Sequence, residues 1–254
     1  MLERLLADQV WALFLVFARM GAAFVVLPGF SEAFVPARAR LLIAGATTFA
    51  LAPVLAPTLP ALPVEPVALA LMVGAEAVAG LFLGLIARLT LAAAHVAGMI
   101  VGFQTSLASA LSFDPSTQQQ GVITSAWLQT LAVVLMLAAD LHHVMLRALA
   151  DSYVLFPPGR WPETGEFAEA ATQMVAHGFA LGVQMAAPFL IYGVVLFAAL
   201  GLLQRLMPQV QIFFLAMPLQ LTVGFVLLAG TIAALMTVFL ADVESALAPF
   251  VVSR

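Results

Sequence analysis

The chain has 254 residues, of which 64% are hydrophobic and only 9% are charged, and its formal net charge is −4. Soluble domains carry about 25% charged residues, so this composition indicates an integral membrane protein. All nine basic residues are arginines without a basic patch, which argues against a nucleic-acid partner. Since the chain has no cysteine, disulfide and thiolate chemistry are excluded.

Long apolar stretches follow one another along the chain. A helix of about 20 residues crosses a bilayer, so these stretches predict about six membrane-spanning helices. The first does not read as a cleaved signal peptide, because Met1–Arg4 carries one acid and one base and is not a positive leader. The stretches cover residues 10–30, 41–57, 67–103, 122–150, 173–203 and 210–240.

Two stretches depart from a simple six-span protein. Residues 41–57 are short and lead into a proline-rich connection that ends at Pro66. Residues 67–103 would form a helix about 55 Å long, far more than a hydrocarbon core of about 30 Å. We therefore expect the second of these stretches to break, tilt strongly or leave the bilayer.

Polar residues lie inside or beside the apolar stretches. Charges are costly in lipid and normally face protein or water. We therefore expect Arg19, Glu76 and Arg88 to be paired with another helix or chain; a relay or substrate pair in a transporter is the other interpretation. Glu76 and Arg88 lie about 18 Å apart along one helix, so they cannot pair with each other unless that helix folds back. Glycine pairs such as Gly80 and Gly84 predict tight helix packing.

The stretch from Gly102 to Gly121 is a polar island in an apolar chain. Its proline, aspartate, serine and threonine residues disfavour helix and predict a loop. Such a loop lies in water or lines a watery cavity. The candidate pore residues are Gly102, Phe103, Gln104, Leu111, Phe113, Asp114, Pro115, Gln118, Gln119 and Gln120.

Asp140, His142 and His143 suggest a metal site only weakly. On a continuous helix Asp140 and His143 share a face while His142 points elsewhere, and no second cluster supplies further ligands. We therefore expect a hydrogen-bonded helix end and no metal. No nucleophile elbow, phosphate-binding loop or dinucleotide motif is present, so we expect neither an enzyme nor a cofactor.

Residues 151–172 are rich in proline and acidic side chains, and they predict the largest solvated loop. This loop would divide the chain into an N-terminal part, 1–172, and a C-terminal part, 173–254. We expect no separate soluble domain.

Short motifs in a fixed order resemble the FliR family of flagellar type III export-gate proteins and its virulence-system relatives, the SctT proteins. The resemblance covers roughly residues 15–240. The motifs are Phe17-Ala18-Arg19, Leu27-Pro28-Gly29-Phe30, Val35-Pro36-Ala37-Arg38, Gly74-Ala75-Glu76, the polar island, Ala139-Asp140-Leu141-His142-His143, Asp151-Ser152-Tyr153, Pro157-Pro158-Gly159, Gly201-Leu202-Leu203-Gln204-Arg205, Pro208-Gln209-Val210 and Met217-Pro218.

The resemblance implies an all-α integral membrane protein of helical hairpins. A FliP-like part, 1–172, would precede a FliQ-like hairpin and tail, 173–254. Such a subunit packs in a helical assembly with FliP and FliQ, with FlhB and FlhA nearby, at the flagellar basal body in the bacterial inner membrane. The resemblance then implies roles between subunits or in buried polar contacts for Arg19, Glu76, Arg88, Asp140, His142, His143, Gln204, Arg205 and Gln209.

This family would pass unfolded flagellar subunits through a pore. We expect residues 102–121 to help close that pore, with Phe103 and Phe113 excluding water as hydrophobic constrictions do. An ordinary exposed connection is the plain alternative for the loop. For the whole protein, a stand-alone small-molecule transporter and a scaffold without pore contact are the competing hypotheses.

Overall fold

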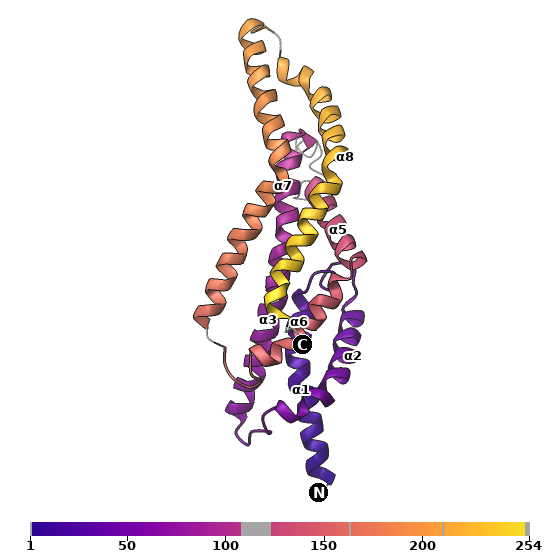
Figure 1. The fold of residues 1–254 in the computed structure, drawn as a ribbon, viewed down its shortest axis with the longest axis vertical. Helices are drawn as coiled ribbons and strands as arrows, with labels where there is room; N and C mark the ends of the chain where they lie inside the picture. The colour runs from indigo at the N-terminus through magenta and orange to yellow at the C-terminus, as the bar shows by residue number, and fades with distance from the viewer. Residues whose placement is uncertain (1, 108–122, 163, 210, 252–254) are drawn as a thin grey trace. The chain divides into compact units, whose positions relative to one another are not determined.

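A computed structural model of the chain describes residues 2–107, 123–162, 164–209 and 211–251 (Figure 1). Every regular element within these ranges is helical, which confirms the predicted all-α class. Most of the polar island lies outside the described residues. The helices are α1 (Leu2–Val26), α2 (Ala37–Leu55), η1 (Ala56–Thr58), α3 (Pro66–Gln104), α5 (Ile123–Ala138), α6 (Leu141–Leu155), α7 (Thr164–Leu206), α8 (Ile212–Leu247) and η3 (Ala248–Phe250).

The helices reproduce the apolar stretches of the sequence. Five of them, α1, α2, α3, α7 and α8, are long and apolar enough to cross a membrane, and the bent pair of α5 and α6 brings the number to six. By length and composition, the described residues thus hold five candidate spans, or six if the bent pair counts as one, in line with the expected number of about six. The stretch 122–150 is not one helix, because it is interrupted at Ala139 and Asp140.

The overlong third stretch does not break. Helix α3 runs for 39 residues without interruption, which corresponds to about 58 Å at 1.5 Å per residue. It contains no proline after its first residue, so nothing in the sequence interrupts its backbone hydrogen bonds. Helices α7 and α8 have 43 and 36 residues and continue through Pro188 and Pro218.

The solvated loop predicted for 151–172 is largely wrong. Helix α6 extends to Leu155 and buries Asp151, Ser152 and Tyr153. Helix α7 begins at Thr164, so Glu166 and Glu169, two of the acidic residues that suggested a loop, lie in its first two turns. Carboxylates are favourable there because they face the positive end of the helix dipole.

The chain divides into two compact units, each assembled from separate segments of sequence. Helices α3, α5, α7 and α8 contribute residues to both. The first unit comprises Met1–Leu89, Met136–Val175 and Val243–Arg254, and the second comprises Thr90–Leu135 and Ala176–Asp242.

The first unit is held by close packing of α1 on α3. A methyl group on Gly80 would overlap the backbone of Arg19, and one on Gly84 would lie 2.8 Å from the Ala23 carbonyl oxygen. The predicted tight packing at this glycine pair is confirmed. Phe82 stacks on Phe167 with ring centroids 3.8 Å apart, which adds an aromatic cluster to the same unit.

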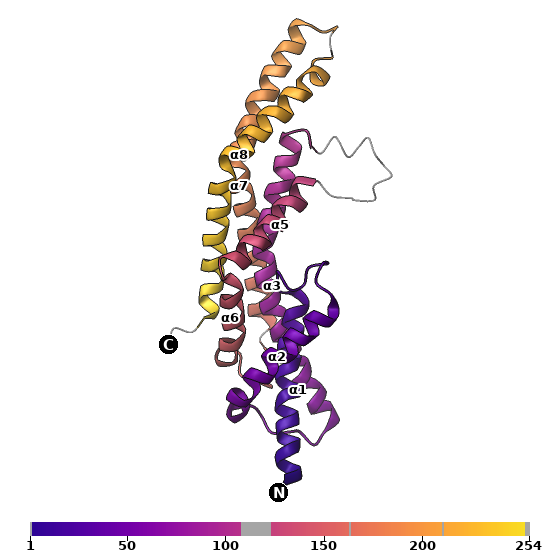
Figure 2. The same ribbon diagram turned by 90° about the vertical axis from the view of Figure 1, so that its right-hand side faces the viewer.

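The second unit contains a hairpin formed by α7 and α8, which lie side by side in both views (Figures 1 and 2). The last turns of α3 pack on α5, where the Thr124 hydroxyl donates a hydrogen bond of 2.8 Å to the Gly98 carbonyl oxygen. Phe189 and Phe239 are fully buried. Only 22% of the apolar window of α7 and 28% of that of α8 is buried, so the hairpin exposes most of its apolar surface.

Candidate functional site

A buried ion pair lies between α1 and α3. The Arg19 guanidinium donates from Nε to Glu76 Oε2 at 2.7 Å and from Nη2 to Glu76 Oε1 at 3.1 Å. Both side chains are only 1% exposed. A bidentate pair of this kind is the strongest geometry for an arginine and a carboxylate. The expectation that both charges find partners is confirmed, and the partners are each other.

The end of α6 and the loop after it supply further hydrogen-bond partners for Arg19 and Glu76. Arg19 also donates to Ser152 Oγ at 3.1 Å and to the Phe156 carbonyl at 3.0 Å. The Gly159 N–H donates to Glu76 Oε1 at 2.8 Å, and the guanidinium carbon lies 3.9 Å from the centre of the Tyr153 ring. The cluster therefore ties together α1, α3 and α6, and both charged side chains direct their hydrogen bonds at the chain itself, while the Tyr153 hydroxyl has no hydrogen-bond partner among the described residues.

The hydrogen bonds of Arg19 and Glu76 within the chain argue against the transporter hypothesis. A substrate or relay pair needs a free donor or acceptor, but Arg19 and Glu76 direct theirs at each other and at their own chain. Arg88 lies more than three turns further along α3, where it reaches Ser31 and Glu32, and its side chain is 38% exposed. As the spacing predicted, it does not pair with Glu76. The embedded charges thus do not favour a stand-alone transporter.

The described part of the candidate pore segment is the end of α3. Gly102 is buried, Phe103 is 60% exposed, and Gln104 is half-buried with its Oε1 lacking a hydrogen-bond partner among the described residues. Helix α3 ends after Gln104, and Ser106 adopts a left-handed conformation with φ of 59°. The remaining candidates, which lie outside the described residues, are Leu111, Phe113, Asp114, Pro115, Gln118, Gln119 and Gln120.

Two helices of the hairpin meet this end of α3, since a methyl group on Gly193 of α7 would overlap the Gln104 side chain and α8 supplies Gln220. Ser106 Oγ donates a hydrogen bond of 2.7 Å to Gln220 Oε1, and the Tyr192 hydroxyl donates to the Gln220 carbonyl at 3.4 Å. Gln220 is 4% exposed. Sequence reasoning missed these residues, although a glutamine inside the apolar stretch 210–240 was a readable signal.

An apolar cavity of about 410 Å³ lies beside the same region. Leu107, which lies within the polar island, and Ile123, which follows it, line this cavity together with Trp127, Phe225 and Leu228. Phe103 and this cavity make the end of α3 largely apolar, and the Ser106–Gln220 hydrogen bond is the polar contact beside them.

Gln204, Arg205 and Gln209 lie at the tip of the hairpin, and all three are exposed in this chain. They are therefore not buried polar residues of the chain itself. A role between subunits stays a prediction for them.

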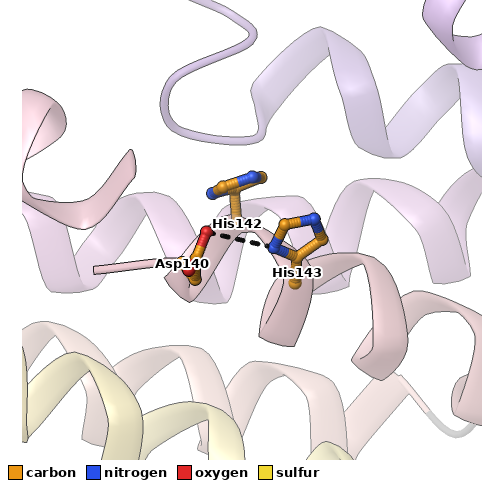
Figure 3. A group of neighbouring side chains, drawn as sticks. All are labelled: Asp140, His142 and His143. Carbon is orange, nitrogen blue, oxygen red and sulfur yellow. Dashed lines mark ion pairs between the residues drawn. The ribbon is translucent and has the colours of Figure 1, made fainter. Parts of the chain in front are cut away.

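The residues Asp140, His142 and His143 converge, contrary to the expectation that His142 points elsewhere (Figure 3). One ligand atom from each lies within 4.8 Å of the other two. The expectation failed because Asp140 is not part of a continuous helix: it precedes α6 in a left-handed conformation, with φ of 59°. Its side chain makes no capping hydrogen bond, and the helix end is instead hydrogen-bonded through its backbone, where the His143 N–H donates to the Asp140 carbonyl at 2.9 Å.

Comparison with known proteins identifies the family. Residues 10–246 match the family described as bacterial export proteins, family 1. Flagellar biosynthetic protein FliR of Caulobacter vibrioides is 37% identical over 233 residues, covering 92% of this chain and 93% of that protein. FliR of Bacillus subtilis is 32% identical over 227 residues, covering 87% and 86%. Yop proteins translocation protein T of Yersinia pestis is 27% identical over 224 residues, covering 84% and 83%.

The match extends over nearly the whole chain, from the first spanning helix to the last turns of α8. It also covers the Arg19–Glu76 cluster and the end of α3. The family is one of export proteins and not one of enzymes. The chain belongs to the bacterial export proteins of family 1, the family of flagellar biosynthetic protein FliR.

Proposed function

We propose that this chain is a core subunit of the flagellar type III protein export gate. It completes a pore with FliP and FliQ in the bacterial inner membrane at the flagellar basal body, with FlhB and FlhA nearby. The pore passes unfolded flagellar subunits and catalyses no reaction. The names of its relatives, flagellar biosynthetic protein FliR and a translocation protein, support this role.

The proposal rests on three helices that are longer than a bilayer requires and that bury less than half of their apolar surface within the chain. Helices α3, α7 and α8 have 39, 43 and 36 residues, whereas about 20 residues cross a bilayer. Their apolar windows are less than half buried within the chain. Apolar helix surface that lipid cannot cover calls for other protein chains. A subunit packed in a helical assembly meets that requirement, and a monomer in lipid does not.

The exposed hairpin tip fits the same role. Gln204, Arg205 and Gln209 cannot lie in hydrocarbon without partners. Neighbouring subunits would supply hydrogen-bond and charge partners at the tip.

We assign the closure of the resting pore to residues 102–121. The described end of this segment carries Phe103 on the last turn of α3, and Ser106 anchors the chain to Gln220 of the hairpin. An exposed aromatic side chain on an anchored helix end is suited to exclude water from a narrow passage.

Assembly is the first test. The chain is expressed with FliP and FliQ, extracted in mild detergent, and its native mass is measured. The expected result is one mass that contains all three proteins. A chain that runs as a monomer in the presence of both partners would contradict the gate role and would agree with a stand-alone transporter.

Closure is tested separately, in assembled gates of unchanged mass. Phe103→Ser and deletion of residues 109–118 are each expected to increase ion leakage across the membrane of growing cells. Phe179→Ser is the matched control, because Phe179 is 61% exposed on α7 and lies outside the proposed closure. Leakage equal to the wild type in both closure variants would disprove this assignment while leaving the assembly role intact.

A further inference from the structure

Three side chains that commonly bind metal ions meet at the junction before α6. Asp140 stands before the first residue of the helix, and His142 and His143 lie in its first turn. One ligand atom from each side chain lies within 4.8 Å of the other two (Figure 3). Two imidazoles and a carboxylate are ligands that Zn²⁺ and related divalent transition metals accept, whereas Mg²⁺ and Ca²⁺ prefer oxygen ligands alone.

The spacing between Asp140 and His143 is that of two ligands and not of a hydrogen bond. Asp140 Oδ1 lies 3.4 Å from His143 Nδ1. N–H···O hydrogen bonds are usually about 2.9 Å long. Two ligands about 2.0–2.1 Å from a tetrahedral ion lie about 3.3 Å apart. A small inward movement of the side chains would place both atoms on one ion.

His142 gives an independent reason to expect a ligand. Its Nδ1 is buried and has no hydrogen-bond partner among the described residues. Its ring centre lies 4.0 Å from that of His143, so two imidazoles share one small volume. A buried ring nitrogen is normally satisfied by a donor, an acceptor, a water or a metal. An ion held by both imidazoles would fix the His142 ring and account for their close approach.

The local backbone explains why the ligands converge. In a continuous helix His142 would point away from the face shared by its neighbours. The left-handed conformation of Asp140 turns its carboxylate toward the first turn of α6 while its carbonyl accepts the His143 N–H at 2.9 Å. Because the side chains of Asp140 and His143 are 77% and 69% exposed, an ion can enter and keep a water ligand.

We propose that Asp140, His142 and His143 bind one divalent transition-metal ion, with Zn²⁺ as the representative. Two imidazole nitrogens, one carboxylate oxygen and water would complete a tetrahedral site. The ion would tie the first turn of α6 to the residue that precedes it. Ligand exchange or loss would then change the rigidity of the junction between α5 and α6.

Metal binding is tested on the full-length chain, purified from membranes with any subunits that remain bound and stripped with a chelator. Co²⁺ is added and its visible absorption is followed, since the bands intensify when nitrogen and oxygen ligands bind it with tetrahedral geometry. The expected result is a single Co²⁺ per chain that Zn²⁺ displaces and Mg²⁺ does not. Spectra that match free Co²⁺ throughout the titration would overturn the proposal.

The ligands are tested one at a time. His143→Ala and Asp140→Asn are each expected to weaken Co²⁺ and Zn²⁺ binding by about tenfold or more. Both side chains are largely exposed, so the variants should fold, and an unchanged melting temperature of the metal-free protein verifies this.

His177→Ala is the matched control. His177 Nε2 lies 2.7 Å from Asp242 Oδ1, so it is another histidine–aspartate pair, and within the described residues no third metal-binding side chain joins it. The control should bind as the wild type does. Equal loss in the control and in His143→Ala, or wild-type affinity in His143→Ala, would overturn the site.

Discussion

Arg19 and Glu76 form a bidentate ion pair across 57 residues of sequence, and neither side chain is more than 1% exposed. The pair occupies the place where α1, α3 and the end of α6 meet. Because both charges are removed from water, their attraction and their hydrogen bonds must offset a large desolvation penalty. A site of this kind is sensitive to the loss of one partner and tolerant of the loss of both.

Glu76→Gln is therefore expected to destabilise the protein strongly. It leaves the Arg19 guanidinium buried without its counter-charge, and breaking a buried pair in this way costs about 3–5 kcal/mol. The melting temperature in detergent and the amount of protein in membranes should both fall. The double variant Arg19→Met with Glu76→Leu removes both charges and should recover much of the loss. A double variant no better than Glu76→Gln would show that the pair does not act as a coupled unit.

Arg88 provides the contrasting case. Its Nη1 lies 3.3 Å from Glu32 Oε1, and its side chain is 38% exposed. Exposed ion pairs contribute about 0–1 kcal/mol, so Arg88→Met should change the melting temperature little. Measured beside Glu76→Gln in one preparation, the two variants should differ clearly. Equal destabilisation would mean that burial does not determine the energetic weight of these charges.

Gly80→Ala tests the close approach of α1 and α3. The added methyl group would overlap the Arg19 carbonyl and the backbone atoms beside it, so the helices must move apart. Overpacking of this kind costs about 1–3 kcal/mol, and the separation would also disturb the Arg19–Glu76 pair. Thermal unfolding is the measurement. Gly45→Ala on α2 is the control, since none of the described atoms outside its own helix backbone lies within 4 Å of the added methyl group and alanine is the better helix former. A Gly80→Ala protein as stable as the control would contradict the packing.

The positions of the helices could be predicted from the sequence better than the contacts between them. Apolar stretches determine where long helices form, so the positions of α1, α3, α7 and α8 could be read directly. The partner of Arg19 could not, because 57 residues separate it from Glu76 and only the packing of α1 on α3 brings them together. The glycines at 80 and 84 indicated that packing without indicating which helix they would contact.

The errors also have physical causes. Length alone left three alternatives for residues 67–103, namely a break, a strong tilt or an exit from the bilayer. The break does not occur, because a helix breaks where its hydrogen bonds are interrupted, and this segment has no internal proline. Acidic residues such as Glu166 and Glu169 suggested a loop, although carboxylates also favour the first turns of a helix. The convergence of Asp140 and His142 depends on one left-handed residue, which the periodicity of a helix cannot anticipate.

Asp140→Gly separates the backbone role of that residue from its role as a ligand. Asp140 has φ of 59°, a conformation that glycine adopts without strain and that other residues adopt at a cost. The metal-free variant should therefore be as stable as the wild type or more stable by up to about 1 kcal/mol. It should nevertheless lose much of the rise in melting temperature that Zn²⁺ gives the wild type, because stabilisation by a ligand grows with the logarithm of its concentration divided by its Kd, and the lost carboxylate raises that Kd. Melting curves with and without Zn²⁺ measure both effects in one series.

Asn tolerates the same conformation, so Asp140→Asn should show the loss of the Zn²⁺ effect without the gain in metal-free stability. A Zn²⁺ effect that persists in Asp140→Gly would remove the carboxylate from the site, and a metal-free variant less stable than the wild type would show that the carboxylate supports the junction by itself.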